Sequence, residues 1–116
     1  MKKTFQFVAV LAAAALAFGS APAANAAATK ACLALDTGGV DDKSFNASAW
    51  SGAQAAAKAN SAVTVKYLAA TSDADYAPNI KKLVDEGCNI VIGVGFLIAG
   101  AVEDAAKKYP KTNFAI

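Results

Sequence analysis

The chain has 116 residues, enough for one small domain, and its eleven basic residues, all of them lysines, face nine acidic residues. Because it has no arginine and no basic stripe, nucleic-acid binding has no electrostatic support. It also has no histidine, which excludes zinc sites built on histidine, Ser-His-Asp triads and Cys-His dyads within this chain.

Residues 1–26 predict a secretory signal peptide. They begin with the basic Met1-Lys2-Lys3, continue with an apolar run over residues 4–18, and end in Ala24-Asn25-Ala26, which fits the small-x-small cleavage rule. A membrane anchor is the alternative, although about 15 apolar residues fall short of the roughly 20 that a spanning helix needs. We therefore expect a bacterial protein that is exported to the periplasm or cell surface and cleaved near Ala26.

From residue 31 onward, strand and helix patterns alternate. The apolar run over 31–35 predicts a buried strand, and residues 62–68 alternate as in a strand with one wet face. Between them, residues 44–59 predict a helix of mostly small side chains. Its sheet-facing stripe is expected to contain Phe45, Ala49, Gly52, Ala53 and Ala56.

The second half of the chain continues this alternation. Residues 76–84 have the apolar spacing of an amphipathic helix, and Gly87 suits the position just after its end. Residues 89–94 predict another buried strand, residues 98–109 a third helix, and residues 113–116 the start of a fourth strand.

This order predicts an α/β fold, a doubly wound parallel sheet with helices on both faces. The strands at 31–35 and 89–94 are continuously apolar and therefore central, whereas the alternating strand at 62–68 belongs at an edge. The predicted strand order is 2-1-3-4, with the switch point between strands one and three. Ligands of such sheets bind beyond the carboxyl ends of the strands at that point.

Two loops that contain glycine leave the predicted switch point. Asp36-Thr37-Gly38-Gly39 follows the first strand, and Gly93-Val94-Gly95-Phe96 ends the third. Because glycine lets backbone N–H groups approach a ligand closely, a ligand site is expected between these loops.

The stretch DTGGVDDKSFNASAW, which starts at the first of these loops, carries the candidate ligand-binding groups. Phe45 offers a ring for stacking, and Asn46 offers both a donor and an acceptor. The carboxylates of Asp36, Asp41 and Asp42 accept hydrogen bonds from hydroxyls. Together these groups suit a neutral polyhydroxylated or heterocyclic solute.

A purely structural interpretation of the same residues stays open. Asp42 or Ser44 simply caps the helix, and Phe45 belongs to the core. The three aspartates are also candidates for a cation site, but the EF-hand spacing is not met. DTGG resembles the catalytic turn of aspartic proteases without the second turn that they need, and GxxxxGK[ST] and GxGxxG are absent. We therefore expect no enzyme, cofactor or metal.

The two cysteines, Cys32 and Cys88, fall near the amino ends of the two predicted central strands. Adjacent strands are about 4.8 Å apart, close to the Cα separation of about 5.5–6 Å in disulfides. A Cys32–Cys88 disulfide is therefore one hypothesis, in keeping with export. The alternatives are two small buried hydrophobes, or lipidation of Cys32, although no clear lipobox precedes it.

GGVDDKSFNASAWSG resembles the signature near the mature N-terminus of the basic membrane protein family, the purine-nucleoside-receptor-A-like substrate-binding proteins of bacterial ABC importers. The resemblance continues through SDADY, GVGF, KYP and FAI and covers essentially all of the mature chain. It implies a type I periplasmic-binding-protein fold, in which two α/β lobes close on a nucleoside. It also implies a permease and an ATPase as partners, with no nucleic acid and no membrane association except through the transporter.

The resemblance also implies roles for individual residues. Carried over by position, Phe45 would stack on the base. Asn46 and the Asp41/Asp42 pair would hydrogen-bond the ligand or shape the loop. Gly93–Phe96, with Gly95 and Phe96 as the ligand-binding residues, would line the cleft from the third strand.

The family runs to roughly three times this length, so residues 27–116 are expected to be part of the N-terminal lobe of a truncated chain. Family members often carry an acidic residue a few positions after GVGF, where this chain has Gly100. The alternatives are a binding protein of the same fold for a sugar or autoinducer, a flavodoxin-like domain without a transport role, and a signalling or adhesion protein.

Overall fold

Four parallel strands form a single sheet in the computed structural model, which describes residues 27–116. The predicted signal peptide and its cleavage site therefore lie outside the described residues. The strand order is β2-β1-β3-β4, which confirms the order predicted from the sequence. The strands are β1 (Thr29–Leu35), β2 (Val63–Ala69), β3 (Ile90–Val94) and β4 (Asn113–Ala115).

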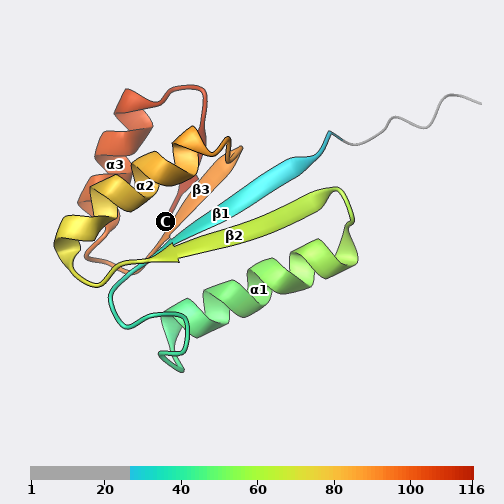
Figure 1. Ribbon diagram of the computed structural model, residues 1–116, viewed down its shortest axis with the longest axis horizontal. Coiled ribbons are helices and arrows are strands. Elements are labelled where there is room, and N and C mark those ends of the chain that lie inside the picture. Colours follow the sequence, from blue (N-terminus) through green and yellow to red (C-terminus); the bar gives the residue numbers. More distant parts are fainter. Residues whose placement is uncertain (1–26) are drawn as a thin grey trace, which may run out of the picture.

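The helices cover both faces of this sheet, as the alternation predicts (Figure 1). Helix α1 (Phe45–Ala59) lies against one face, and α2 (Tyr76–Asp85) and α3 (Ala99–Lys108) lie against the other. A short 3₁₀ turn, η1 (Asp73–Asp75), leads into α2. Within residues 27–116, none of the helices has both the length and the apolar character needed to cross a membrane.

The strand register brings the loops after β1 and β3 together. Leu35 pairs with Val94 on one side and with Ala69 on the other, so the three strands end at the same level. The N–H of Asp36 continues the ladder by donating to the carbonyl of Val94 over 3.2 Å. The chain segments that follow β1 and β3 therefore leave the sheet side by side.

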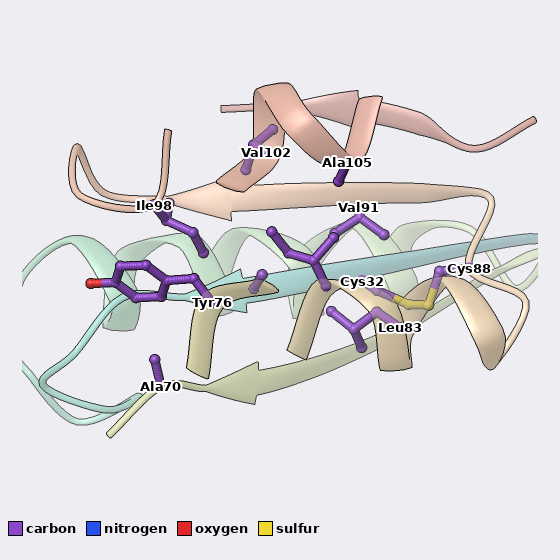
Figure 2. Packing of buried hydrophobic residues seen from close by; sticks show 11 residues of the cluster. Cys32, Ala70, Tyr76, Leu83, Cys88, Val91, Ile98, Val102 and Ala105 are labelled. Atoms are coloured by element: carbon purple, nitrogen blue, oxygen red, sulfur yellow. A yellow bond between two sulfur atoms is a disulfide. The ribbon is translucent and has the colours of Figure 1, made fainter. Parts of the chain in front are cut away.

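The larger core lies between the sheet and the pair α2 and α3 (Figure 2). Ile80 and Leu83 of α2 and Val91 of β3 are at most 1% exposed. Burying one such aliphatic side chain contributes about 1.5–3 kcal/mol. Tyr76 reaches into the same core, and in Figure 2 its hydroxyl points away from the other labelled side chains.

The smaller core, on the α1 face, corrects the predicted phase of that helix. Ala49, Trp50 and Ala53 pack against the sheet, and the Trp50 ring meets Tyr67 of β2 edge-on at 4.8 Å between centroids. Phe45 is 72% exposed, so the interpretation that placed it in the core is wrong. Ala49 and Ala53 face the sheet as predicted, whereas Phe45, Gly52 and Ala56 are exposed. Asn46 is buried and Trp50 partly buried, so the buried stripe runs about one residue from the predicted one.

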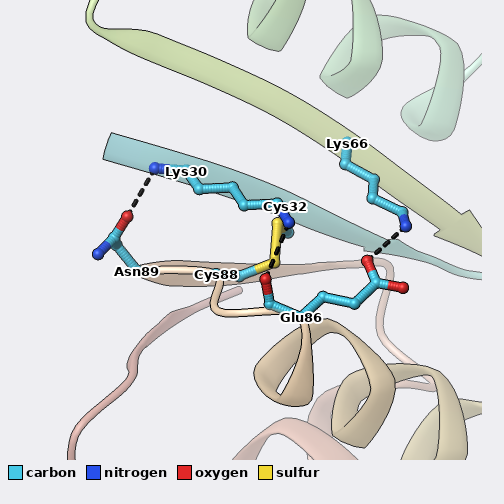
Figure 3. Close-up of a disulfide and its surroundings, with 6 residues drawn as sticks. All are labelled: Lys30, Cys32, Lys66, Glu86, Cys88 and Asn89. Atoms are coloured by element: carbon cyan, nitrogen blue, oxygen red, sulfur yellow. Dashed lines mark hydrogen bonds and ion pairs between the residues drawn. A yellow bond between two sulfur atoms is a disulfide. The ribbon is translucent and has the colours of Figure 1, made fainter. Parts of the chain in front are cut away.

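Cys32 and Cys88 form a disulfide, with their Cα atoms 6.0 Å apart (Figure 3). It joins β1 to the turn between α2 and β3, and both residues are buried, which is inconsistent with a lipid on Cys32. Polar contacts surround it: Lys66 pairs with Glu86, and Lys30 donates from its Nζ to the Glu86 carbonyl at 2.9 Å. The hydrogen bond from Lys66 lowers the pKa of Glu86.

Candidate functional site

A groove of about 640 Å³ lies beyond the carboxyl ends of β1 and β3, at the predicted switch point. Two loops and the start of α1 form it, together with the end of β4. Four of the predicted ligand-binding residues line it, namely Asp36, Phe45, Gly95 and Phe96. The other lining residues are Leu97, Ala99 and Ile116.

Large apolar side chains are exposed to solvent around this groove. Phe45 is 72% exposed, Phe96 92%, Leu97 72% and Ile116 67%. Exposed apolar side chains gathered around one groove make it a candidate binding surface. Two of these side chains are aromatic rings, which offer flat faces for stacking on a heterocycle.

The Asp36 carboxylate is held at the edge of the groove by three donors to one oxygen, the weakest of them the Thr37 hydroxyl at 3.4 Å. The backbone N–H of Thr37 donates to Asp36 Oδ1 over 2.6 Å, and the hydroxyl of Tyr76 donates to the same atom. Accepting from this hydroxyl, the carboxylate raises the pKa of Tyr76 above its usual value, and burial adds to the shift.

Asn46 is buried beneath the first loop, with 1% of its surface exposed, and does not line the groove. Its Nδ2 donates to the carbonyls of Asp36 (3.1 Å) and Gly39 (3.0 Å), so the side chain ties the loop to the start of α1. Its Oδ1 is also buried and has no hydrogen-bond partner within residues 27–116. Of the predicted roles for Asn46, the structure displays the shaping of the loop.

Asp42 caps α1, which agrees with the structural interpretation of this residue. Its Oδ1 accepts from the N–H groups of Ser44 (2.8 Å) and Ala47 (3.0 Å), and its Oδ2 accepts from Asn46 (3.1 Å). The hydrogen bond from Ala47 is the main cause that lowers the pKa of Asp42. Ser44 makes no capping hydrogen bond through its side chain.

Asp41 lies exposed in the turn before α1 and is not part of the groove lining. The three aspartates of this stretch therefore have different places: Asp36 lines the groove, Asp42 caps α1, and Asp41 is an exposed charge. Residues 27–116 contain no group of three or more histidine, cysteine, aspartate or glutamate side chains placed to hold a metal ion. Gly100 also falls outside the groove lining, on the exposed side of α3.

Sequence reasoning missed four contributors to this site. Three of them, Leu97, Ala99 and Ile116, line the groove because the segment after β3 and the end of β4 lie together, which no local pattern predicts. Tyr76 was assigned to the core of α2 from its spacing, and its ring is buried there. Its hydroxyl was the available signal, since a buried tyrosine O–H normally has a hydrogen-bond partner.

A second hollow of about 570 Å³ lies between α2 and α3, on the outer side of these helices. Its lining includes Lys81, Asp104 and Tyr109. It is remote from the strand ends and contains none of the predicted site residues. The groove at the switch point is therefore the candidate functional site.

Fold and groove together define an α/β unit with an open groove at the switch point of a parallel sheet. The model of the family described as "ABC transporter substrate-binding protein PnrA-like" matches residues 29–116. The chain belongs to this family.

Individual relatives agree with the family match. The "CD4+ T-cell-stimulating antigen" of Listeria monocytogenes is 41% identical over 88 residues, which are 72% of this chain and 25% of that protein. The "ABC transporter nucleoside-binding protein BmpA" of Lactococcus lactis is 38% identical over 90 residues, or 75% of this chain and 26% of that protein. The chain thus spans about a quarter of the length of the curated relatives that it matches.

Solved structures show the same fold. An ABC transporter solute-binding protein from Aeropyrum pernix K1 superposes with a TM-score of 0.66 at 28% identity, covering 74% of this chain and 23% of that one. The α/β architecture with strand order 2-1-3-4 is therefore shared with part of a solute-binding protein.

Proposed function

We propose that the groove binds a purine nucleoside as one wall of the ligand site of an extracytoplasmic ABC importer subunit. The observation that carries this proposal is the gathering of two exposed aromatic rings, Phe45 and Phe96, with the carboxylate of Asp36 at one groove. The nucleoside-binding relative from Lactococcus lactis supports the choice of ligand.

The chemistry of the groove divides between its apolar and polar sides. A nucleobase stacked on an aromatic side chain gains about 1–3 kcal/mol, without depending on which base it is. A carboxylate contributes only hydrogen-bond acceptors, so Asp36 would select ligands that present hydroxyl or N–H donors. Because the groove is open, a second lobe would close over the ligand and supply the opposite wall.

Calorimetry on the protein isolated from its own host tests this proposal. Adenosine, guanosine and inosine should bind more tightly than ribose or glucose, because a free sugar lacks the planar aromatic base that stacks on Phe45 and Phe96. Recovery of the nucleoside unchanged by chromatography would separate binding from turnover. Binding of ribose or glucose in preference to nucleosides would contradict the proposal and indicate a sugar-binding protein of the same fold.

Two substitutions at Phe45 sharpen the same test. Phe45→Tyr keeps an aromatic face and should retain nucleoside affinity within about threefold, whereas Phe45→Leu keeps only apolar volume. Loss of about 1–3 kcal/mol of stacking corresponds to roughly 5- to 150-fold weaker binding by Phe45→Leu. Equal affinities of the two variants would argue against stacking on Phe45.

Export is the second part of the proposal, and the disulfide supports it. Disulfides such as Cys32–Cys88 persist in oxidising compartments and are rare in the cytosol. The intact mass of the native protein should correspond to an N-terminus at Ala27 and increase by about two daltons on reduction. A protein that retains Met1, or whose cysteines are free thiols in its host, would contradict export with cleavage.

A further inference from the structure

The two oxygens of the Asp36 carboxylate have different surroundings. Oδ1 accepts from the N–H and the hydroxyl of Thr37 and from the hydroxyl of Tyr76. Oδ2 accepts no hydrogen bond within residues 27–116, and it is not among their completely buried unpaired atoms. Asp36 also lines the groove. One oxygen is therefore used to orient the carboxylate, and the other is free to accept from a ligand.

Tyr76 is well placed to fix this orientation. It is the first residue of α2, its ring is 4% exposed, and Ile80 follows one turn later in the same core cluster. A ring packed in this way has few alternative rotamers, so its hydroxyl is presented from a rigid support. The hydroxyl points out of the cluster of core side chains (Figure 2). The hydrogen bond thus connects the α2 core to the groove.

Gly95 leaves the room that the second oxygen needs. A Cβ at position 95 would lie 2.9 Å from the Cβ of Asp36 and 3.0 Å from its Cγ, and closest of all to Oδ2. The loop after β3 therefore passes directly beside this oxygen. Only a residue without a side chain allows Asp36 to keep its present orientation.

We propose that Tyr76 is a positioning residue for ligand recognition, holding Asp36 so that Oδ2 accepts a hydrogen bond from a hydroxyl or N–H group of the ligand. This inference rests on the proposed function, since it concerns the same groove. It adds a residue that does not touch the ligand and lies 40 positions from Asp36 in the sequence. A flexible carboxylate would lose conformational freedom on binding, and an oriented one avoids that cost.

The test compares Tyr76→Phe with the wild type, using adenosine and four analogues: 2′-deoxyadenosine, 3′-deoxyadenosine, 5′-deoxyadenosine and purine riboside, which lacks the amino group. Tyr76→Phe removes only the hydroxyl and keeps the buried ring. We expect about tenfold weaker binding of adenosine, the size of one hydrogen bond to a charged group. For the analogue that lacks the donor to Asp36, the variant and the wild type should bind equally.

A purely structural role for Tyr76 would weaken all five compounds by the same factor, and that result overturns the inference. An unchanged adenosine affinity in Tyr76→Phe overturns it as well. Tyr109→Phe is the matched control, because it removes a hydroxyl from a tyrosine outside the groove and should leave every affinity unchanged. Failure of the wild type to bind any nucleoside is a separate result, which overturns the proposed function and this inference with it.

Asp36→Asn provides a second variant should Tyr76→Phe not fold. The amide keeps one oxygen for Thr37 and Tyr76 and replaces the free oxygen with a donor. It should weaken adenosine and spare the same analogue that Tyr76→Phe spares. Different analogues spared by the two variants would mean that Tyr76 does not act through Asp36.

Discussion

Gly95 lies so close to Asp36 that a Cβ at position 95 would come within 2.9 Å of the Asp36 Cβ. Its φ is +109°, a backbone conformation that side chains rarely adopt. The loop after β3 thus passes directly beside the Asp36 side chain, where a residue with a Cβ would clash. Both residues line the groove.

Gly95→Ala should therefore impair both stability and ligand binding. Gly87→Ala is the matched control, because Gly87 also has a positive φ, +80°, but nothing lies within 4 Å of its added Cβ. Gly87→Ala should reduce the free energy of unfolding by about 1–2 kcal/mol through backbone strain alone. Gly95→Ala should cost more and weaken nucleoside binding, as measured by urea unfolding and calorimetry. Equal unfolding costs together with unchanged binding would contradict the proposed contact.

The cap on α1 predicts a pH dependence of stability. Because three backbone N–H groups donate to Asp42, with Ala47 the main cause, the pKa of Asp42 is lowered in the folded protein. Its contribution is fully present above the ordinary aspartate pKa of about 4 and is lost as pH falls through the lowered folded-state value. Urea midpoints of Asp42→Asn should lie below those of the wild type at pH 7 and converge with them in acid.

Asp41→Asn is the control for the Asp42 prediction. It removes the same charge from the neighbouring exposed residue, for which the described part of the chain shows no hydrogen-bond partner. Its urea midpoint should therefore follow that of the wild type across the same pH range. If Asp41→Asn and Asp42→Asn behaved alike, general charge repulsion would replace the cap as the explanation.

The architecture and the place of the groove were both accessible from sequence. Apolar runs at β1 and β3 and alternation at β2 decide which strands are central, and strand order then decides where a ligand binds. The groove lies where Asp36 and Gly95 were expected to meet. These features depend on hydrophobic pattern and topology, which a single sequence carries.

The individual roles were less accessible because they depend on packing. The orientation of α1 that exposes Phe45 and buries Asn46 is accompanied by the packing of Trp50 on Tyr67, a contact between separate elements. In the same way, the hydrogen bond from Tyr76 to Asp36 joins residues 40 positions apart. Local spacing identifies which residues are candidates, but tertiary contacts decide which of them face the ligand.

Substituting one leucine in the core and one in the groove distinguishes effects on stability from effects on binding. Leu83 is fully buried, so Leu83→Ala should lower the free energy of unfolding by about 2–5 kcal/mol. Leu97 is 72% exposed in the groove, so Leu97→Ala should change stability by less than about 0.5 kcal/mol and yet weaken nucleoside binding. Urea unfolding followed by Trp50 fluorescence and calorimetry on the same samples would measure both. If Leu97→Ala bound nucleosides with wild-type affinity, Leu97 would not contact the ligand.

The disulfide should stabilise the fold without taking part in recognition. It joins residues 56 positions apart, and closing a loop of that length in the unfolded chain corresponds to about 4 kcal/mol. Cys32→Ala/Cys88→Ala should therefore lower the free energy of unfolding, measured in urea, by a comparable amount. Dithiothreitol should destabilise the wild type but not the double variant. Cys88 lies just before the amino end of β3, whereas the groove lies beyond the carboxyl end of β3. The nucleoside affinity of the folded variant should therefore remain unchanged. A variant that unfolds like the wild type but binds more weakly would instead tie the disulfide to the ligand site.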